Sequence, residues 1–213
     1  MNTHRGKDFD PQDVLDFWFP ETGHENDPET HRAFWVERMQ GGMDGAIIAR
    51  FSGVTIAAAR GLLDHWAETP RGRLALLIVL DQFPRSLWRD TPAAYAQDIQ
   101  AARLALEGIK NGDVDQLEAW EMAFFLIAVA HCEGPDHAAR LRSVSVFVEK
   151  VVYKTPSQIA QAGPHHKAQY ERVLDIIDTF GRHPHRNAIL SRHSTPAEEA
   201  YIAEGDFPHT PKS

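Results

Sequence analysis

Two stretches of this chain are apolar on every side of a helix, and they constrain the fold more than any other feature. LALLIVL spans residues 74–80 and MAFFLIAVA spans residues 122–130. Both are much shorter than the roughly 20 residues that a membrane-spanning helix needs. A short helix that is apolar all round must be covered by other helices. The pattern therefore predicts two central helices inside a soluble helical protein.

Proline and glycine mark the ends of the other predicted helices. Thr-Pro pairs suit the first helical turn, because threonine caps free N–H groups and proline lacks one. The segment VFVEKVVY at 146–153 is rich in β-branched residues but continues a helical apolar spacing. The expected helices lie near 11–19, 28–40, 43–66, 70–82, 92–110, 114–133, 136–152 and 164–181, with a short one after Thr195.

This pattern predicts an all-α fold, a single compact bundle of about eight antiparallel helices. We expect one domain over residues 1–213, with a C-terminal arm from about residue 182 packed back on the bundle.

Charge and cysteine content narrow the classes of function. The formal net charge is −8, and residues 1–45 carry ten acids against four bases. Such a balance argues against general binding of nucleic acid, which depends on neutralising phosphates. The single cysteine, Cys132, excludes an internal disulfide, and the first residues have no apolar signal-peptide core. We expect a cytoplasmic protein that does not bind membranes.

The segment FGRHPHRNAIL, at 180–190, is a local basic island in this acidic chain. An extended path through Pro184 would place His183 and His185 on one side, and Arg182 and Arg186 on the other. Arginine matches phosphate or carboxylate and opposes a metal dication, so an anion suits the segment better than a metal. The alternative is a structural staple, in which the two arginines reach acidic groups of the protein, such as Asp81, Glu121 or Glu133, and hold the C-terminal arm to the bundle.

Polar residues also follow both apolar helices. Asp81 and Arg85 flank the Phe83-Pro84 turn, where they can pair and cap the helix end. His131 and Glu133 follow the second apolar stretch. Neither Glu118 nor Glu121 has a histidine three or four residues later, as carboxylate metal sites in helix bundles require. We predict no metal and no cofactor.

Four blocks of the sequence resemble one bacterial family. The blocks are DVLDFWFP at 13–20, TPRGRLALLIVLDQFPRSLWR at 69–89, HCE at 131–133 and FGRHPHRNAILSRHSTPAEEAYI at 180–202. The chain resembles the family known as domain of unknown function 924, which is placed among tetratricopeptide-like all-helical folds. The resemblance covers nearly the whole chain and implies one helical domain, but no activity.

The chain departs from that family at three places. The family usually has phenylalanine at the position of His183, asparagine at that of Ser86, and a Leu-Pro pair within 126–129. The resemblance therefore implies a recurring polar set of Arg182, His185, Arg186 and Asn187, with His183 in an apolar slot.

One hypothesis is a pocket that binds a small anionic ligand. It would form where the turn at 80–89, the end of the helix at 114–133 and the segment at 181–187 converge. His185 would act as general acid or base, oriented by Glu133 or Asp81. The candidate catalytic residues are His185 and Glu133, and the candidate ligand-binding residues are Arg182, Arg186, Asn187, Asp81, Arg85 and His131.

The second hypothesis is a helical scaffold for a peptide or protein partner, in which the Arg/His segment is purely structural. The acidic residues 1–45 would supply a charged face. The sequence does not decide between the two hypotheses, whether the pocket is catalytic, or the oligomeric state.

Overall fold

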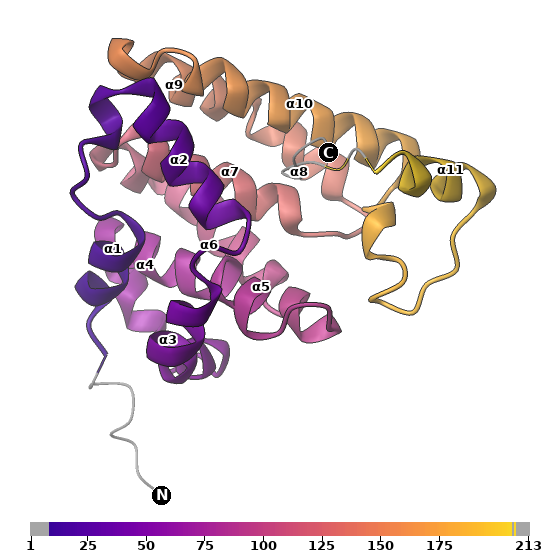
Figure 1. Ribbon diagram of the computed structural model, residues 1–213, viewed down its shortest axis with the longest axis horizontal. Helices are drawn as coiled ribbons and strands as arrows, with labels where there is room; N and C mark the ends of the chain where they lie inside the picture. Colours follow the sequence, from indigo (N-terminus) through magenta and orange to yellow (C-terminus); the bar gives the residue numbers. More distant parts are fainter. Residues whose placement is uncertain (1–8, 206, 208–213) are drawn as a thin grey trace, which may run out of the picture.

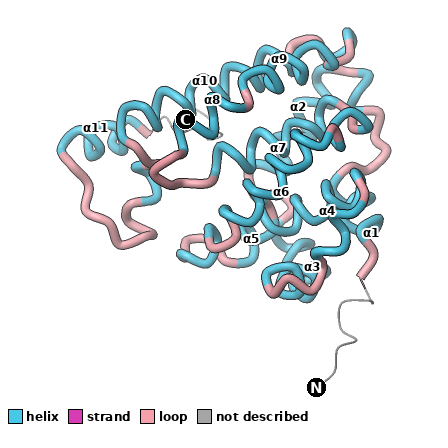
Figure 2. The backbone as a smooth tube through the Cα atoms, turned by 180° about the vertical axis from the view of Figure 1, so that it is seen from behind, coloured by secondary structure: helices cyan, strands magenta, loops and turns pink. Residues whose placement is uncertain are grey.

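The computed structural model describes residues 9–205 and 207, which contain α-helices and 3₁₀ turns but no strand (Figures 1 and 2). The predicted all-α fold is confirmed. The helices are α1 Pro11–Trp18, α2 Pro28–Met39, α3 Asp44–Ala59, α4 Pro70–Asp81, α5 Phe83–Leu87, α6 Asp98–Asn111, α7 Ala119–His131, α8 His137–Ser143, α9 Ser145–Lys154, α10 Ala162–Phe180 and α11 Pro196–Glu204.

The two apolar stretches form the central helices, as predicted. On α4 every residue from Gly72 to Asp81 is buried, and on α7 the same holds from Glu121 to Ala130. Helix α4 packs against α1, α3, α6 and α7, while α7 also contacts α8, α9 and α10. Both views show α7 between α6 and the long helix α10 (Figures 1 and 2). One hydrophobic core is therefore built around this pair.

Several predicted helices are shorter or divided in the structure. The helix expected at 43–66 ends at Ala59, because Gly61 takes a left-handed conformation with φ +71° and a 3₁₀ turn follows. The helix expected at 136–152 is two helices, α8 and α9, separated at Val144. Short 3₁₀ turns replace the first residues expected at 92–110 and 114–133. The prediction of about eight helices was therefore too low.

The start of α7 explains the pair of glutamates that sequence reasoning tested as a metal site. Glu118 and Glu121 form a capping box, in which the backbone N–H of Glu118 donates to Glu121 Oε2 at 3.0 Å. Arg71 pairs with the other oxygen of Glu121. Both carboxylates thus stabilise the beginning of the helix.

The C-terminal arm begins where α10 ends at Gly181, which is left-handed with φ +71°. The next residues were expected to be extended, but Pro184–Arg186 forms the 3₁₀ helix η6, since proline suits the first position of a helix. Helix α11 then packs against η6. Within the described residues, no helix combines the length and apolarity needed to cross a membrane.

Candidate functional site

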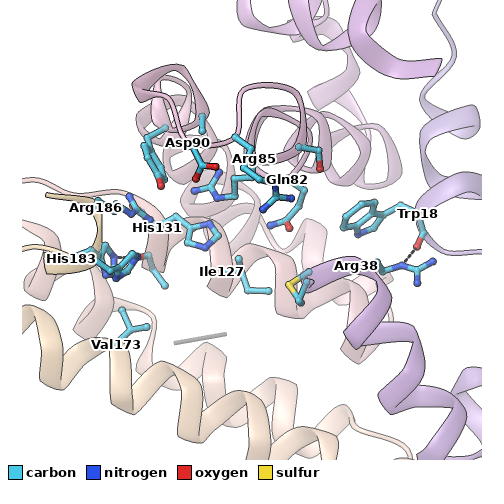
Figure 3. Close-up of a pocket in the computed structure, with 17 residues that line it drawn as sticks. Trp18, Arg38, Gln82, Arg85, Asp90, Ile127, His131, Val173, His183 and Arg186 are labelled. Atoms are coloured by element: carbon cyan, nitrogen blue, oxygen red, sulfur yellow. Dashed lines mark hydrogen bonds between the residues drawn. The ribbon is translucent and has the colours of Figure 1, made fainter. Parts of the chain in front are cut away.

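A cleft of about 280 Å³ opens beside the C-terminal ends of the two central helices (Figure 3). Its walls come from α1, α2, α5, α7, α10, η6 and the segment that follows α5. The lining residues are Trp18, Arg38, Met39, Gln82, Arg85, Ser86, Arg89, Asp90, Ala94, Tyr95, Ile127, Ala130, His131, Val173, His183, His185 and Arg186.

An aspartate and a histidine pair at this end of the core. Asp81 is the last residue of α4 and is 1% exposed; His131 is the last residue of α7 and lines the cleft. His131 Nδ1 lies 2.9 and 3.1 Å from the two oxygens of Asp81. Because an ionised carboxylate only accepts, His131 donates from Nδ1. The carboxylate thereby fixes the tautomer and the orientation of the histidine ring.

A second aspartate joins two arginines of the cleft. Asp98, at the start of α6, accepts from Arg85 Nη2 at 2.9 Å and from Arg186 Nη1 at 3.1 Å. Burial lowers the pKa of Arg85, but the negative charges of Asp81 and Asp98 outweigh it, so the net pKa is raised. For Arg186 burial prevails, and its pKa is lowered despite Asp98. The Arg186 guanidinium also lies over the ring of Tyr95, 4.5 Å from its centre.

Arg38 brings a further positive charge to the opposite wall. Its guanidinium donates to the carbonyl oxygens of Trp18 at 2.7 Å and Phe34 at 2.9 Å. Burial lowers its pKa to about 10, so the group remains charged at neutral pH. Figure 3 shows Arg38 and Trp18 on one side of the cleft, and His131, His183 and Arg186 on the other.

The lining is rich in donors and poor in acceptors. It includes four arginines but a single carboxylate, Asp90, while Asp81 and Asp98 lie behind the wall. Two buried N–H groups on lining residues, Trp18 Nε1 and Arg186 Nε, have no hydrogen-bond partner among the described residues. Buried donors are rarely left unpaired, so this wall is short of hydrogen-bond acceptors.

His137, His183 and His185 lie next to one another but do not form a metal site. His183 Nε2 donates to the carbonyl oxygen of Ala130 at 2.9 Å, and burial lowers the pKa of this ring well below its ordinary value. Across residues 9–205 and 207, no group of three or more His, Cys, Asp or Glu side chains could hold a metal ion.

The sequence of this chain matches a known protein family. The family model described as a bacterial protein of unknown function (DUF924) matches residues 14–206. The chain belongs to this family.

The solved structure of a similar chain supports the fold. It is a protein of unknown function, ATU0120, from Agrobacterium tumefaciens, with 30% sequence identity and a TM-score of 0.68. The match covers 92% of this chain and 97% of that one. A search of curated proteins found no match.

Within this DUF924 fold, half of the predicted site residues gather at the cleft. Arg85, His131, His185 and Arg186 line it, and Asp81 supports His131 from behind. The expected pair of Asp81 and Arg85 is present, with 3.4 Å between Asp81 Oδ1 and Arg85 Nη1.

The other predicted site residues are engaged elsewhere and do not line the cleft. Arg182 donates to both oxygens of Glu198, at 2.7 and 2.9 Å, and so fastens α11. Asn187 Nδ2 donates to Ser194 Oγ at 2.9 Å, and its side-chain oxygen accepts from Arg192. These contacts hold the C-terminal arm together.

Glu133 also has a structural set of partners. It accepts from the backbone N–H of His183 at 2.7 Å and pairs with Arg192. Burial raises the pKa of Glu133, but these hydrogen bonds, led by that of Arg192, outweigh it and the net pKa is lowered. The staple alternative named Asp81, Glu121 and Glu133 as examples of partners for Arg182 and Arg186. Both arginines do pair with the protein's own carboxylates, but with Glu198 and Asp98 respectively.

Sequence reasoning missed Trp18, Arg38 and Tyr95. Trp18 lies in DVLDFWFP, one of the blocks that carries the family resemblance, so a signal existed. Arg38 is three and four residues after Trp35 and Phe34, which places it on the same face of α2 as two aromatic residues. A charged residue in such a position is a candidate for a buried, functional contact.

Proposed function

We propose that this protein binds a small anionic ligand in the cleft at the C-terminal ends of α4 and α7. The observation that supports the proposal is the composition of the lining, with four arginines against one carboxylate. Arginine presents a planar set of donors that matches carboxylate and phosphate. The unpaired N–H groups of Trp18 and Arg186 add donors that lack acceptors among the described residues.

The residues that line the cleft would have different roles in ligand binding. Arg85 is 20% exposed and Arg89, which pairs with Asp44, is 51% exposed, so these two guanidinium groups can contact a ligand directly. Arg186 is 4% exposed and Arg38 is 2% exposed, so both contribute chiefly through their charge. His131, oriented by Asp81, would donate a hydrogen bond to the ligand or exchange a proton with it.

This assignment moves the proposed proton-exchanging role from His185 and Glu133 to His131 and Asp81. Glu133 is occupied by Arg192 and the backbone of His183, whereas Asp81 holds a ring that lines the cleft. Arg182 and Asn187 are proposed to serve the C-terminal arm instead of the ligand.

Titration calorimetry with sodium phosphate and sodium acetate, at constant ionic strength set by sodium chloride, tests the proposal. We expect saturable binding of at least one anion, and a loss of about 10- to 100-fold in affinity for Arg85→Gln, because a charge-assisted hydrogen bond contributes about 1.5–3 kcal/mol.

The matched control is Arg103→Gln, whose side chain is 71% exposed on α6 and does not line the cleft. It should bind as the unmodified protein does. Equal affinity of Arg85→Gln and the control, with both variants folded by circular dichroism, would contradict the proposal.

A further inference from the structure

A second and larger hollow lies along α7, between α2 and α10. Its volume is about 810 Å³, which is within the range of small-molecule sites. The lining residues are Pro28, His31, Arg32, Trp35, Val36, Met39, Gln40, Ile127, Ile159, Gln161, Ala162, Pro164, His165, His166 and Gln169. We call it the α2–α10 groove.

The α2–α10 groove lies next to the cleft. Met39 and Ile127 line both of them. A small hollow between the two shares Ile127, Ala130 and Val173 with the cleft, and His166 and Gln169 with the groove. Figure 3 shows Ile127 on α7 in the middle of the cleft, between His131 and Arg38. The three hollows therefore adjoin one another along α7, and Ile127 lines all of them.

The groove and the cleft differ in chemistry. The groove side presents Trp35, Val36, Met39, Ile127 and Ile159 beside Arg32, three histidines and three glutamines, and no aspartate or glutamate lines it among the described residues. The cleft is lined by four arginines.

The aromatic wall of the groove is held in place by neighbouring side chains. Trp35 Nε1 donates to His31 Nε2 at 2.9 Å, and the Trp35 ring stacks on Phe124 with 5.1 Å between centres. These contacts fix the orientation of the Trp35 ring, so this ring needs little ordering on binding.

We propose that the cleft and the α2–α10 groove together bind one amphiphilic ligand, an unbranched alkyl carboxylate. The carboxylate would lie beside Arg85 and His131, and the alkyl chain would pass over Ile127 and Met39 into the groove. This inference rests on the proposed function, since the arginines supply the charge that recognises the head.

Surface composition favours a small molecule over a protein partner. Among the groove residues only Val36, at 40%, is a large apolar side chain that is substantially exposed in the described part of the chain. A stable protein interface buries roughly 800 Å² on each partner and is centred on exposed anchors. The apolar surface here lies inside a narrow hollow, where a chain of methylenes fits.

The test is titration calorimetry with sodium acetate, butanoate, hexanoate and octanoate, all below their aggregation concentrations and at one ionic strength. Each methylene that enters the groove should raise affinity about fourfold, so octanoate should bind about 200-fold more tightly than butanoate. Met39→Gln places a polar group where the cleft joins the groove. It should reduce the gain in affinity per methylene below about twofold.

Ile56→Gln is the matched control, since Ile56 is an exposed apolar residue of α3 that lines neither hollow. Its chain-length series should equal that of the unmodified protein. Arg85→Gln should weaken every carboxylate by the same factor and keep the gain per methylene.

The two proposals fail in different ways. If acetate binds and longer chains bind no better, the amphiphile is ruled out and the anion cleft stands. If octyltrimethylammonium binds as tightly as octanoate, the anion cleft itself is wrong. If octanoate gains affinity but Met39→Gln and Ile56→Gln behave alike, the chain does not pass through this groove and the inference is overturned.

Discussion

Replacing Asp98 with asparagine should destabilise the protein strongly, because it removes the negative charge between two guanidinium groups. Asp98 is 5% exposed and accepts from Arg85 at 2.9 Å and from Arg186 at 3.1 Å. Asparagine keeps one acceptor but turns an N–H₂ group toward an arginine. Arg85 retains Asp81, whereas Arg186 loses the carboxylate that offsets its burial.

The expected loss in free energy of unfolding follows from the number of arginines that keep a carboxylate partner. Breaking a buried ion pair by removing one partner costs about 3–5 kcal/mol, and one arginine here keeps a carboxylate, so we expect about 3 kcal/mol. For a chain of this length that corresponds to a fall in melting temperature of about 6–12 °C. Urea unfolding followed by far-ultraviolet circular dichroism gives the free energy of unfolding directly.

Two comparisons make the measurement decisive. Asp115→Asn removes a carboxylate that is 55% exposed and pairs with Lys150, so it should cost less than about 1 kcal/mol. Adding Arg186→Met to Asp98→Asn should restore part of the loss, because the uncompensated charge is gone. A loss for Asp98→Asn no larger than that of the exposed control, or no recovery in the double variant, would refute the reasoning.

Three further predictions use other parts of the structure. Burial lowers the pKa of His31 from 6.5 to about 4, so between these pH values the unfolded chain binds a proton that the folded chain does not. The free energy of unfolding should therefore fall by up to about 1.4 kcal/mol per pH unit as the pH drops through that interval. His31→Gln should flatten this slope in urea unfolding. The hydrogen bond from Arg182 lowers the pKa of Glu198 from 4.5 to about 2. The contribution of Glu198 to the free energy of unfolding is therefore present above pH 4.5 and lost toward pH 2. Glu198→Gln should remove this acid dependence and increase hydrogen exchange in α11. A Cβ at Gly72 would collide with the carbonyl oxygen of Trp66, so Gly72→Ala should lower the free energy of unfolding by at least about 1–3 kcal/mol in the same assay.

The sequence predicted the fold well where the signal was local. The centre of the bundle follows from the all-round apolar stretches at 74–80 and 122–130, which no exposed helix could tolerate. The break at Val144 was missed because neither proline nor glycine marks it; the change of direction there depends on packing against other helices. That residues 1–213 form a single domain, in the cytoplasm, stays a prediction.

The candidate site was predicted only in part, for a related reason. Position at the end of a buried helix identified Asp81 and His131, since a helix end is where polar groups meet a core. The ion-pair partner of Arg182 was not predictable in the same way. Several carboxylates of the chain were equally suitable, and only the path of the C-terminal arm brings Glu198 next to Arg182. Trp18 and Arg38 meet across 20 residues of chain, a contact that no local pattern encodes.

The contacts of Arg85 and Arg186 also change the choice between a structural staple and a ligand site. Arg85 donates to the carbonyl oxygen of Asp81, the last residue of α4, and Arg186 donates to that of His131, the last residue of α7, at 2.8 Å. Each arginine therefore caps one of the two central helices at its negative, carbonyl-bearing end. Buried helix ends require such donors whether or not a ligand binds.

The same requirement places two permanent positive charges on the wall of one cleft. The structural role of these arginines and the proposed recognition of an anion are consequently two results of one arrangement, and they can be separated experimentally. A lysine at position 85 retains the charge but has no planar fork of donors. Arg85→Lys should therefore weaken carboxylate binding severalfold in calorimetry, while the melting temperature changes by only a few degrees. If Arg85 is purely structural, the variant should instead be less stable, and no binding of carboxylate should be detected in either protein.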